Sequence, residues 1–219
     1  TQFMRDLFKV SDPGEARGAK LTAREILDRG AERVDRELAG QPAIQARLLG
    51  TLGVVYMNLG EYDRAEQLMQ RSVAIRRSVL SADKPALAES LSQLAWLYYL
   101  QDKFDKSLPL AREALALQRA QLGEDDPAVA STLHTVASIL DVSGDHAQAA
   151  VVFARTLAIR EKAFGPQSIE VARSLNSLGV VYKAMGDFKR ARAYYDRALA
   201  IAAHTIGEDS PNALMWLNN

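Results

Sequence analysis

The stretch LNSLGVVYKAMGDFKRA, residues 175–191, decides the fold of this chain. The apolar side chains of Leu175, Leu178 and Tyr182 recur at three- and four-residue spacing, which places them on one face of a helix. A Met-Gly-Asp-Phe step then interrupts the pattern, and its glycine, Gly186, suits the left-handed conformation that ends many helices. The stretch therefore predicts two antiparallel helices joined by a tight turn.

The same pattern returns with a period of 42 residues over four copies. In every copy the first helix (helix A) carries matching apolar and small residues, and the second (helix B) carries a matching alanine. The columns are Leu49, Leu91, Leu133 and Leu175; Leu52, Leu94, Val136 and Leu178; Gly53, Ala95, Ala137 and Gly179; Tyr56, Tyr98, Leu140 and Tyr182; and Ala74, Ala116, Ala158 and Ala200. Chance does not align so many columns, so we interpret the chain as a repeat protein.

Turn and capping residues set the bounds of the expected helices. Helix A is expected at 44–58, 86–100, 128–142 and 170–184, and helix B at 62–80, 104–121, 146–163 and 188–205. A further amphipathic helix is expected at 22–39, in front of the first repeat. The expected organisation is a helical lead-in at 1–42, four repeats at 43–211 and the start of a fifth repeat at 212–219.

Composition excludes several classes of protein. Lys and Arg together number 27, as do Asp and Glu, and this neutral balance argues against a general nucleic-acid or anionic-membrane binder. No apolar run approaches the roughly 18 residues that span a bilayer, and no signal peptide begins at Thr1. Because the chain begins without Met, we expect a soluble fragment of a longer protein. The cytoplasm is favoured, and an extracytoplasmic location stays open if a membrane helix precedes the fragment in its parent.

The sequence contains no recognisable catalytic or metal-binding motif. The chain has no cysteine, which excludes disulfides and thiolate metal sites. The three histidines, His134, His146 and His204, do not share a helix face at the spacing of a metal site. No nucleophile elbow, phosphate loop or dinucleotide-binding glycine pattern appears. The sequence therefore predicts a non-enzyme with no cofactor and no metal.

The repeat columns resemble the tetratricopeptide repeat family. The period of 42 exceeds the usual length of about 34, and loops such as Gly-Glu-Asp-Asp-Pro are similar to those of kinesin light chain repeats. The resemblance implies an all-α, right-handed superhelical solenoid of antiparallel helix pairs, with helix A lining a concave groove that binds protein or peptide. Kinesin light chains carry Leu-Asn-Asn-Leu in helix A, and here only Asn176 keeps the first asparagine. Their cargo-peptide specificity is therefore not carried over.

A second resemblance covers the start of the chain. LFKVSDP at 7–13 and TAREILDRGA at 22–31 are similar to the segment that leads into the repeats of large bacterial serine/threonine kinases. That resemblance implies the docking or regulatory region of a signalling protein. The chain itself carries none of the kinase motifs.

The family pattern assigns a set of helix A residues to the groove, where a protein or peptide ligand is expected. They are Arg47, Val54, Met57, Asn58, Glu89, Trp96, Tyr99, His134, Asp141, Arg173, Asn176 and Lys183. Trp96 and Tyr99 are either anchors for a ligand or fillers of a gap toward the neighbouring A helix. Arg173, Asn176 and Lys183 either meet a ligand carboxylate or form a solvated helix face.

Two functions follow from this reading. The first is docking of a protein segment in the groove, with no nucleic acid and no direct membrane contact. The alternative is structural self-association, as a homodimer, through the apolar residues of the unfinished fifth repeat. These are Leu214, Trp216 and Leu217.

Overall fold

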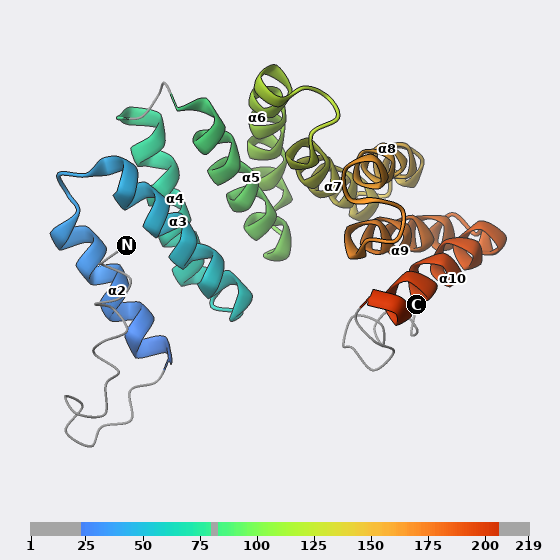
Figure 1. Ribbon diagram of the computed structural model, residues 1–219, viewed down its shortest axis with the longest axis horizontal. Coiled ribbons are helices and arrows are strands. Elements are labelled where there is room, and N and C mark those ends of the chain that lie inside the picture. Colours follow the sequence, from blue (N-terminus) through green and yellow to red (C-terminus); the bar gives the residue numbers. More distant parts are fainter. Residues whose placement is uncertain (1–22, 80–82, 206–219) are drawn as a thin grey trace. The chain divides into compact units, whose positions relative to one another are not determined.

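A computed structural model describes residues 23–79 and 83–205, and every regular element in these ranges is a helix (Figure 1). The first is α2 (Ala23–Glu37). The A helices are α3 (Pro42–Asn58), α5 (Lys84–Leu100), α7 (Pro127–Val142) and α9 (Ile169–Ala184). The B helices are α4 (Tyr62–Ser78), α6 (Phe104–Leu122), α8 (His146–Phe164) and α10 (Phe188–Thr205). The expected start of a fifth repeat at 212–219 lies outside the described residues.

The predicted helices are confirmed, with small shifts at their ends. Each A helix begins with proline or a capped first turn; in α7 the side chain of Asp126 accepts a hydrogen bond of 2.8 Å from the amide of Ala128. The tight turns take the left-handed conformation expected of Gly186, which has a φ of 78°. Asp102 holds the same place in the second copy with a φ of 57°, a conformation that aspartate tolerates better than most residues.

The chain divides into two compact units, and the division falls inside α5. The first unit, Thr1–Ser90, contains α2, α3 and α4. Its core is built by the predicted columns, since Leu49 and Tyr56 are buried against α4. The hydroxyl of Tyr56 also donates a hydrogen bond of 2.7 Å to Asp28, which joins α3 to α2. The lead-in helix is thus attached to the first repeat by both apolar and polar contacts.

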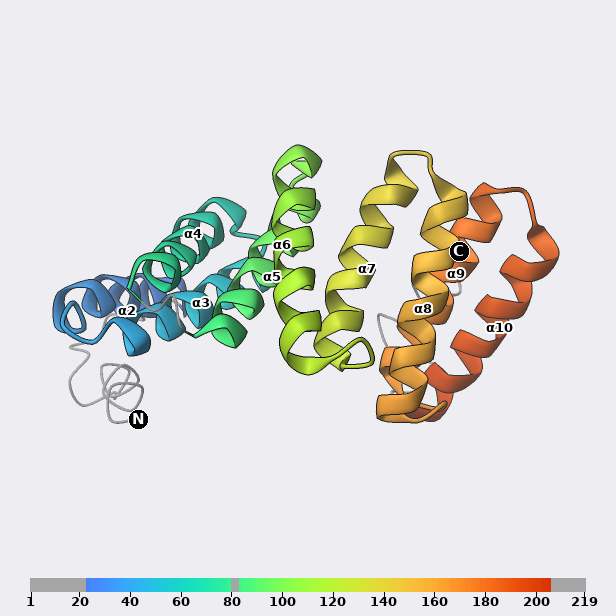
Figure 2. The same ribbon diagram turned by 90° about the horizontal axis from the view of Figure 1, so that it is seen from above.

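The second unit, Leu91–Asn219, contains the end of α5 and the described helices α6 to α10. Figure 2 shows α7 beside α8 and α9 beside α10, and α8 also packs against α9. Leu175 and Leu178 are fully buried in the core of the last repeat, together with Ile201 from α10. No helix within the described ranges is long and apolar enough to cross a bilayer.

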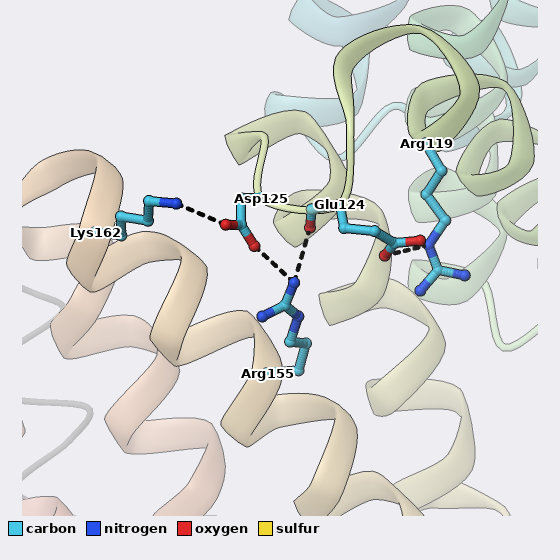
Figure 3. Close-up of polar contacts among 5 residues, drawn as sticks. All are labelled: Arg119, Glu124, Asp125, Arg155 and Lys162. Atoms are coloured by element: carbon cyan, nitrogen blue, oxygen red, sulfur yellow. Dashed lines mark hydrogen bonds and ion pairs between the residues drawn. The ribbon is translucent and has the colours of Figure 1, made fainter.

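The loop between α6 and α7 is fastened to α8 by charged groups (Figure 3). The Asp125 carboxylate lies 2.6 Å from an Nη atom of Arg155 and 2.6 Å from the Nζ atom of Lys162. Neighbouring Glu124 pairs with Arg119 at 2.9 Å. These groups are exposed, so each pair contributes little by itself, but together they join the B helices of consecutive repeats.

Candidate functional site

In the first unit, the predicted site residues stand on the helix A surface. Arg47 and Asn58 are exposed on α3, and Glu89 is exposed on α5. Val54 and Met57 are half-buried on α3.

In the second unit, three predicted site residues come together. The rings of Trp96 and Tyr99 stack with their centroids 5.0 Å apart and their planes at 22°. The ring of His134 on α7 lies 6.0 Å from that of Trp96 and 5.2 Å from that of Phe153 on α8. We call Trp96, Tyr99, His134 and Phe153 the aromatic cluster. It joins two A helices and one B helix, so Trp96 does pack toward the neighbouring A helix while staying half-buried.

The pKa of the Tyr99 phenol reflects both its burial and its polar surroundings. Burial raises the pKa of its phenol, and hydrogen bonding to Ser138 on α7 opposes that rise. The charge of Asp141 raises the pKa as well. Asp141 is itself engaged, because its carboxylate lies 2.7 Å from the Nδ1 atom of His146. The contact between Asp141 and His146 therefore joins the end of α7 to the first residue of α8.

His134 is the member of the aromatic cluster with a buried polar atom that lacks a hydrogen bond in the described ranges. Its Nδ1 atom is buried and has no hydrogen-bond partner among the residues that the structure describes. Burial, with smaller contributions from the charges of Arg160 and Arg173, lowers the pKa of this imidazole from 6.5 to about 3. The ring is therefore neutral at physiological pH.

The remaining predicted residues lie along α9. Arg173 and Lys183 are exposed and Asn176 is half-buried. Of these, Arg173 is near enough to His134 and to Arg160 to lower the pKa of both. Arg173 lies in the first half of α9, whereas Lys183 lies in its last turn.

Arg160, on the B helix α8, is a site residue that the sequence reasoning missed. Its Nη1 atom donates hydrogen bonds of 2.8 Å to the Oγ atom of Ser174 and 3.4 Å to the carbonyl oxygen of Glu170. Gln118 stands 42 residues earlier, and it accepts a hydrogen bond of 2.7 Å from Thr132, which stands 42 residues before Ser174. We call this recurrent B-to-A bond the inter-repeat bond. Both columns are readable in the sequence, but the family pattern assigns binding residues to helix A alone, and Gln118 and Arg160 belong to helix B.

Comparison with known proteins identifies the class. The sequence profile of the tetratricopeptide repeat matches residues 44–120, 101–162, 128–204 and 170–219. These overlapping matches cover most of the chain, which therefore belongs to the tetratricopeptide repeat family. Members of this family are generally non-catalytic interaction modules, and no catalytic family is indicated. A search of curated proteins found no match.

Several solved structures share the fold. BtubC (BKLC) from P. vanneervenii is 24% identical, over 94% of this chain and 80% of its own, with a TM-score of 0.71. A putative kinesin light chain with nearly identical TPR-like repeats, from Podosopora anserina, is 20% identical over 94% and 95%, with a TM-score of 0.65. A Rap protein complexed with Competence and Sporulation Factor is 16% identical over 99% and 56%, with a TM-score of 0.74. At these identities the likeness establishes the fold, an all-α helical repeat solenoid.

Proposed function

We propose that this chain docks a protein or peptide segment along its A helices, and that the aromatic cluster is the anchor point. The observation that carries the proposal is the half-buried stack of Trp96 and Tyr99 against His134. Large aromatic side chains with part of their surface still open are the commonest anchors of protein interfaces. The stacking of the two rings on each other and the contact of Trp96 with His134 hold these rings in place before a ligand arrives, which reduces the entropy cost of binding.

The charged side chains around the aromatic cluster orient the ligand in this proposal. Arg173 supplies a guanidinium on one side, with Asn176 and Lys183 further along α9, and Asp141 supplies a carboxylate beside Tyr99. The positions in the first unit, Arg47 to Asn58 on α3 and Glu89 on α5, are proposed as separate and weaker contacts. Solved relatives include a Rap protein in complex with Competence and Sporulation Factor, which supports a peptide as the class of ligand.

The kind of parent protein that we propose rests on the first residues of the sequence. The segments at 7–13 and 22–31 resemble the lead-in to the repeats of large bacterial serine/threonine kinases. We therefore place the fragment in the regulatory or docking region of a signalling protein of that kind. In this arrangement 43–211 is the docking module, and 1–42 connects it to the rest of the parent.

The experiment uses a photo-crosslinking residue at exposed Ser131 on α7, one turn of helix from His134. Crosslinked partners from lysate of the source cells are identified by mass spectrometry, then purified and titrated against the wild type and the Trp96→Ala/Tyr99→Ala variant. We expect at least a tenfold loss of affinity in the variant, since anchor residues contribute more than about 1 kcal/mol each.

The matched control is Val151→Ala/Phe164→Ala, which removes two apolar side chains that are 70% and 47% exposed on the B helix α8. This variant should bind as the wild type does, and all three proteins should give the same helical circular dichroism. Equal affinity of the wild type and the Trp96→Ala/Tyr99→Ala variant for the purified partner would contradict the proposal.

A second candidate is self-association at the last repeat. Phe188 is 70% exposed and Met185 48% exposed at the turn between α9 and α10, and such apolar surface favours association. The proposed contact adds Leu214, Trp216 and Leu217, which lie outside the described residues. Sedimentation over a hundredfold range of concentration tests it. A dimer that Trp216→Asp dissociates and Trp96→Ala does not would favour assembly, and a concentration-independent monomer would remove this candidate.

A further inference from the structure

The tight turn between α9 and α10 carries an exposed aromatic ring. Phe188, the first residue of α10, is 70% exposed, and Met185 in the turn is 48% exposed. The turn stands at the edge of the second unit opposite the α8–α9 loop (Figure 2). An apolar side chain stabilises a fold in proportion to the area that it buries. Packing of the repeat therefore does not account for a ring this open.

In the two preceding repeats, the residue at this position is covered by the last turn of helix A. The ring of Phe104 lies 5.9 Å from the ring of Tyr99. The Nδ1 atom of His146 lies 2.7 Å from the carboxylate of Asp141. Lys183 holds the corresponding place in the last repeat, and a lysine offers neither a ring nor a carboxylate. The first residue of α10 is therefore left open at the surface.

The same turn is the most basic of the four tight turns. Residues 183–192 include four basic side chains and one acidic side chain. The corresponding residues 141–150 include two aspartates and neither lysine nor arginine, and residues 99–108 include two acidic and two basic side chains. In residues 57–66 the acidic side chains outnumber the basic ones. The last turn thus differs from the others in its charge as well as in its open ring.

The apolar and basic side chains of this turn form one exposed surface, which we call the basic turn patch. It consists of Met185, Phe188, Lys189, Arg190 and Arg192. Arg190 pairs with Asp187 at 2.6 Å, and Arg192 pairs with Asp196 at 3.6 Å. The two guanidinium groups are 63% and 84% exposed, and ion pairs this exposed contribute little. Both arginines can therefore exchange these carboxylates for other anions at small cost.

We propose that the basic turn patch binds the surface of an anionic lipid bilayer. Phe188 and Met185 enter the boundary between headgroups and acyl chains, and the long basic side chains reach the lipid phosphates. This surface is separate from the aromatic cluster, so the inference does not depend on the docking proposal. It departs from the expectation of no direct membrane contact, which rested on the neutral balance of the whole chain and not on this local surface.

A lipid surface fits the basic turn patch better than a protein partner does. A stable protein interface buries about 800 Å² on each partner, whereas this patch offers two apolar side chains. A second copy in a two-fold contact would place the same basic side chains against each other. A bilayer surface needs no matching shape, and a few inserted apolar side chains beside basic ones give reversible binding.

The test is co-sedimentation with vesicles at physiological ionic strength. One set of vesicles is phosphatidylcholine alone, and the other is an equal mixture of phosphatidylcholine and phosphatidylglycerol. We expect binding to the mixed vesicles and none to phosphatidylcholine. Phe188→Ser should weaken this binding about tenfold, because it removes a large apolar side chain from the lipid. Lys189→Gln should weaken it about fivefold, because it removes one charge from the anionic surface.

The control is Val151→Ser on α8, which changes an apolar side chain that is also 70% exposed but lies outside the basic turn patch. It should bind the mixed vesicles as the wild type does, and all variants should give the same helical circular dichroism. The chain has no cysteine, so Met185→Cys and Val151→Cys each accept one environment-sensitive dye. We expect the emission of the dye at 185 to shift to the blue with mixed vesicles, and that of the dye at 151 to stay unchanged.

Binding to neither kind of vesicle, or equal binding to both, overturns the inference. So does binding of Phe188→Ser that equals that of the wild type, or an unshifted dye at 185. A dimer that Phe188→Ser dissociates, in a protein that binds no vesicle, would assign the patch to a second copy instead. The docking proposal would survive each of these results, because its test measures the Trp96→Ala/Tyr99→Ala variant against the purified partner without lipid.

Discussion

Thr132 on α7 donates a hydrogen bond of 2.7 Å to the Oε1 atom of Gln118 on α6, and both residues are buried. The same hydroxyl lies 2.8 Å from that of Ser92 on α5, so one small polar group links three consecutive helices. The next junction repeats the B-to-A contact with Arg160 and Ser174. Apolar packing between helices tolerates sliding, whereas a buried hydrogen bond is satisfied in one register only.

Removing the Thr132 hydroxyl should therefore destabilise the second unit. Thr132→Val keeps the shape of the side chain but leaves the buried Gln118 oxygen without its donor, which costs about 1–3 kcal/mol. Urea unfolding followed by circular dichroism should show a lower midpoint. Ser131→Ala is the neighbouring control, because the Ser131 hydroxyl is exposed and bonds only to its own helix, at the carbonyl of Pro127. A Thr132→Val midpoint equal to that of Ser131→Ala would contradict this reading.

The two glycines of the small-residue column should respond differently to alanine. A Cβ atom on Gly179 would clash with a ring carbon of Tyr195, so the rigid ring has to move, whereas on Gly53 it would lie 2.6 Å from the Cγ atom of buried Met69, an unbranched side chain that adapts more easily than a ring. Overpacking costs about 1–3 kcal/mol, and alanine gains about 1 kcal/mol over glycine in a helix. We expect Gly179→Ala to lower the melting temperature and Gly53→Ala to change it little. The reverse order would show that the ring of Tyr195 yields more easily than Met69.

Acid should destabilise the chain through His134. The pKa of this imidazole is about 3 when folded and near 6.5 when unfolded, so the unfolded state binds more protons below pH 6.5. The contribution of the neutral His134 ring to the free energy of unfolding is complete above pH 6.5. It falls by about 1.4 kcal/mol for each pH unit below that value, which amounts to about 2 kcal/mol at pH 5. Urea unfolding at pH 7.5 and pH 5 should show this loss in the wild type and a smaller one in His134→Phe. An identical pH dependence of the urea midpoint in both proteins would disprove a role of His134 in acid destabilisation.

The charged cluster of the α6–α7 loop should contribute in a salt-dependent way. Asp125→Asn removes the ion pairs with Arg155 and Lys162, whose hydrogen bonds hold the pKa of the Asp125 carboxyl below its usual value (Figure 3). The urea midpoint should fall slightly at low ionic strength, and the difference should vanish at about 1 M salt, where the screening length is near 3 Å. Asp125 is exposed, so its ion pairs should be screened by salt. A large fall in the urea midpoint of Asp125→Asn that persists at high salt would contradict this account of the Asp125 carboxylate.

The repeat columns were enough to predict the helices and most of the core. Leu49, Leu91 and Leu175 are fully buried as their constant spacing requires, and the helix bounds differ from the expected ones by at most two residues. A position that keeps the same residue in all four repeats is not always buried, however. The alanines of helix B, at 74, 116, 158 and 200, are all exposed.

The candidate site was only partly predictable. Trp96 and His134 were assigned to the helix A surface by their register, but periodicity cannot tell that their rings touch or that His134 keeps a buried Nδ1 atom without a partner. Arg160 was missed because a long side chain carries its charge well away from its own helix, from the B layer to the edge of α9. Contacts made by long side chains between repeats depend on rotamers, which a repeat pattern does not specify.

The most direct test of the docking account is the affinity of the purified, crosslinked partner for three proteins of equal helicity: the wild type, Trp96→Ala/Tyr99→Ala and Val151→Ala/Phe164→Ala. The measurement is a fluorescence anisotropy titration with the labelled partner. The account predicts at least a tenfold weaker Kd for the aromatic variant and an unchanged Kd for the α8 variant. An unchanged Kd for Trp96→Ala/Tyr99→Ala would contradict it and would place the binding surface away from the aromatic cluster.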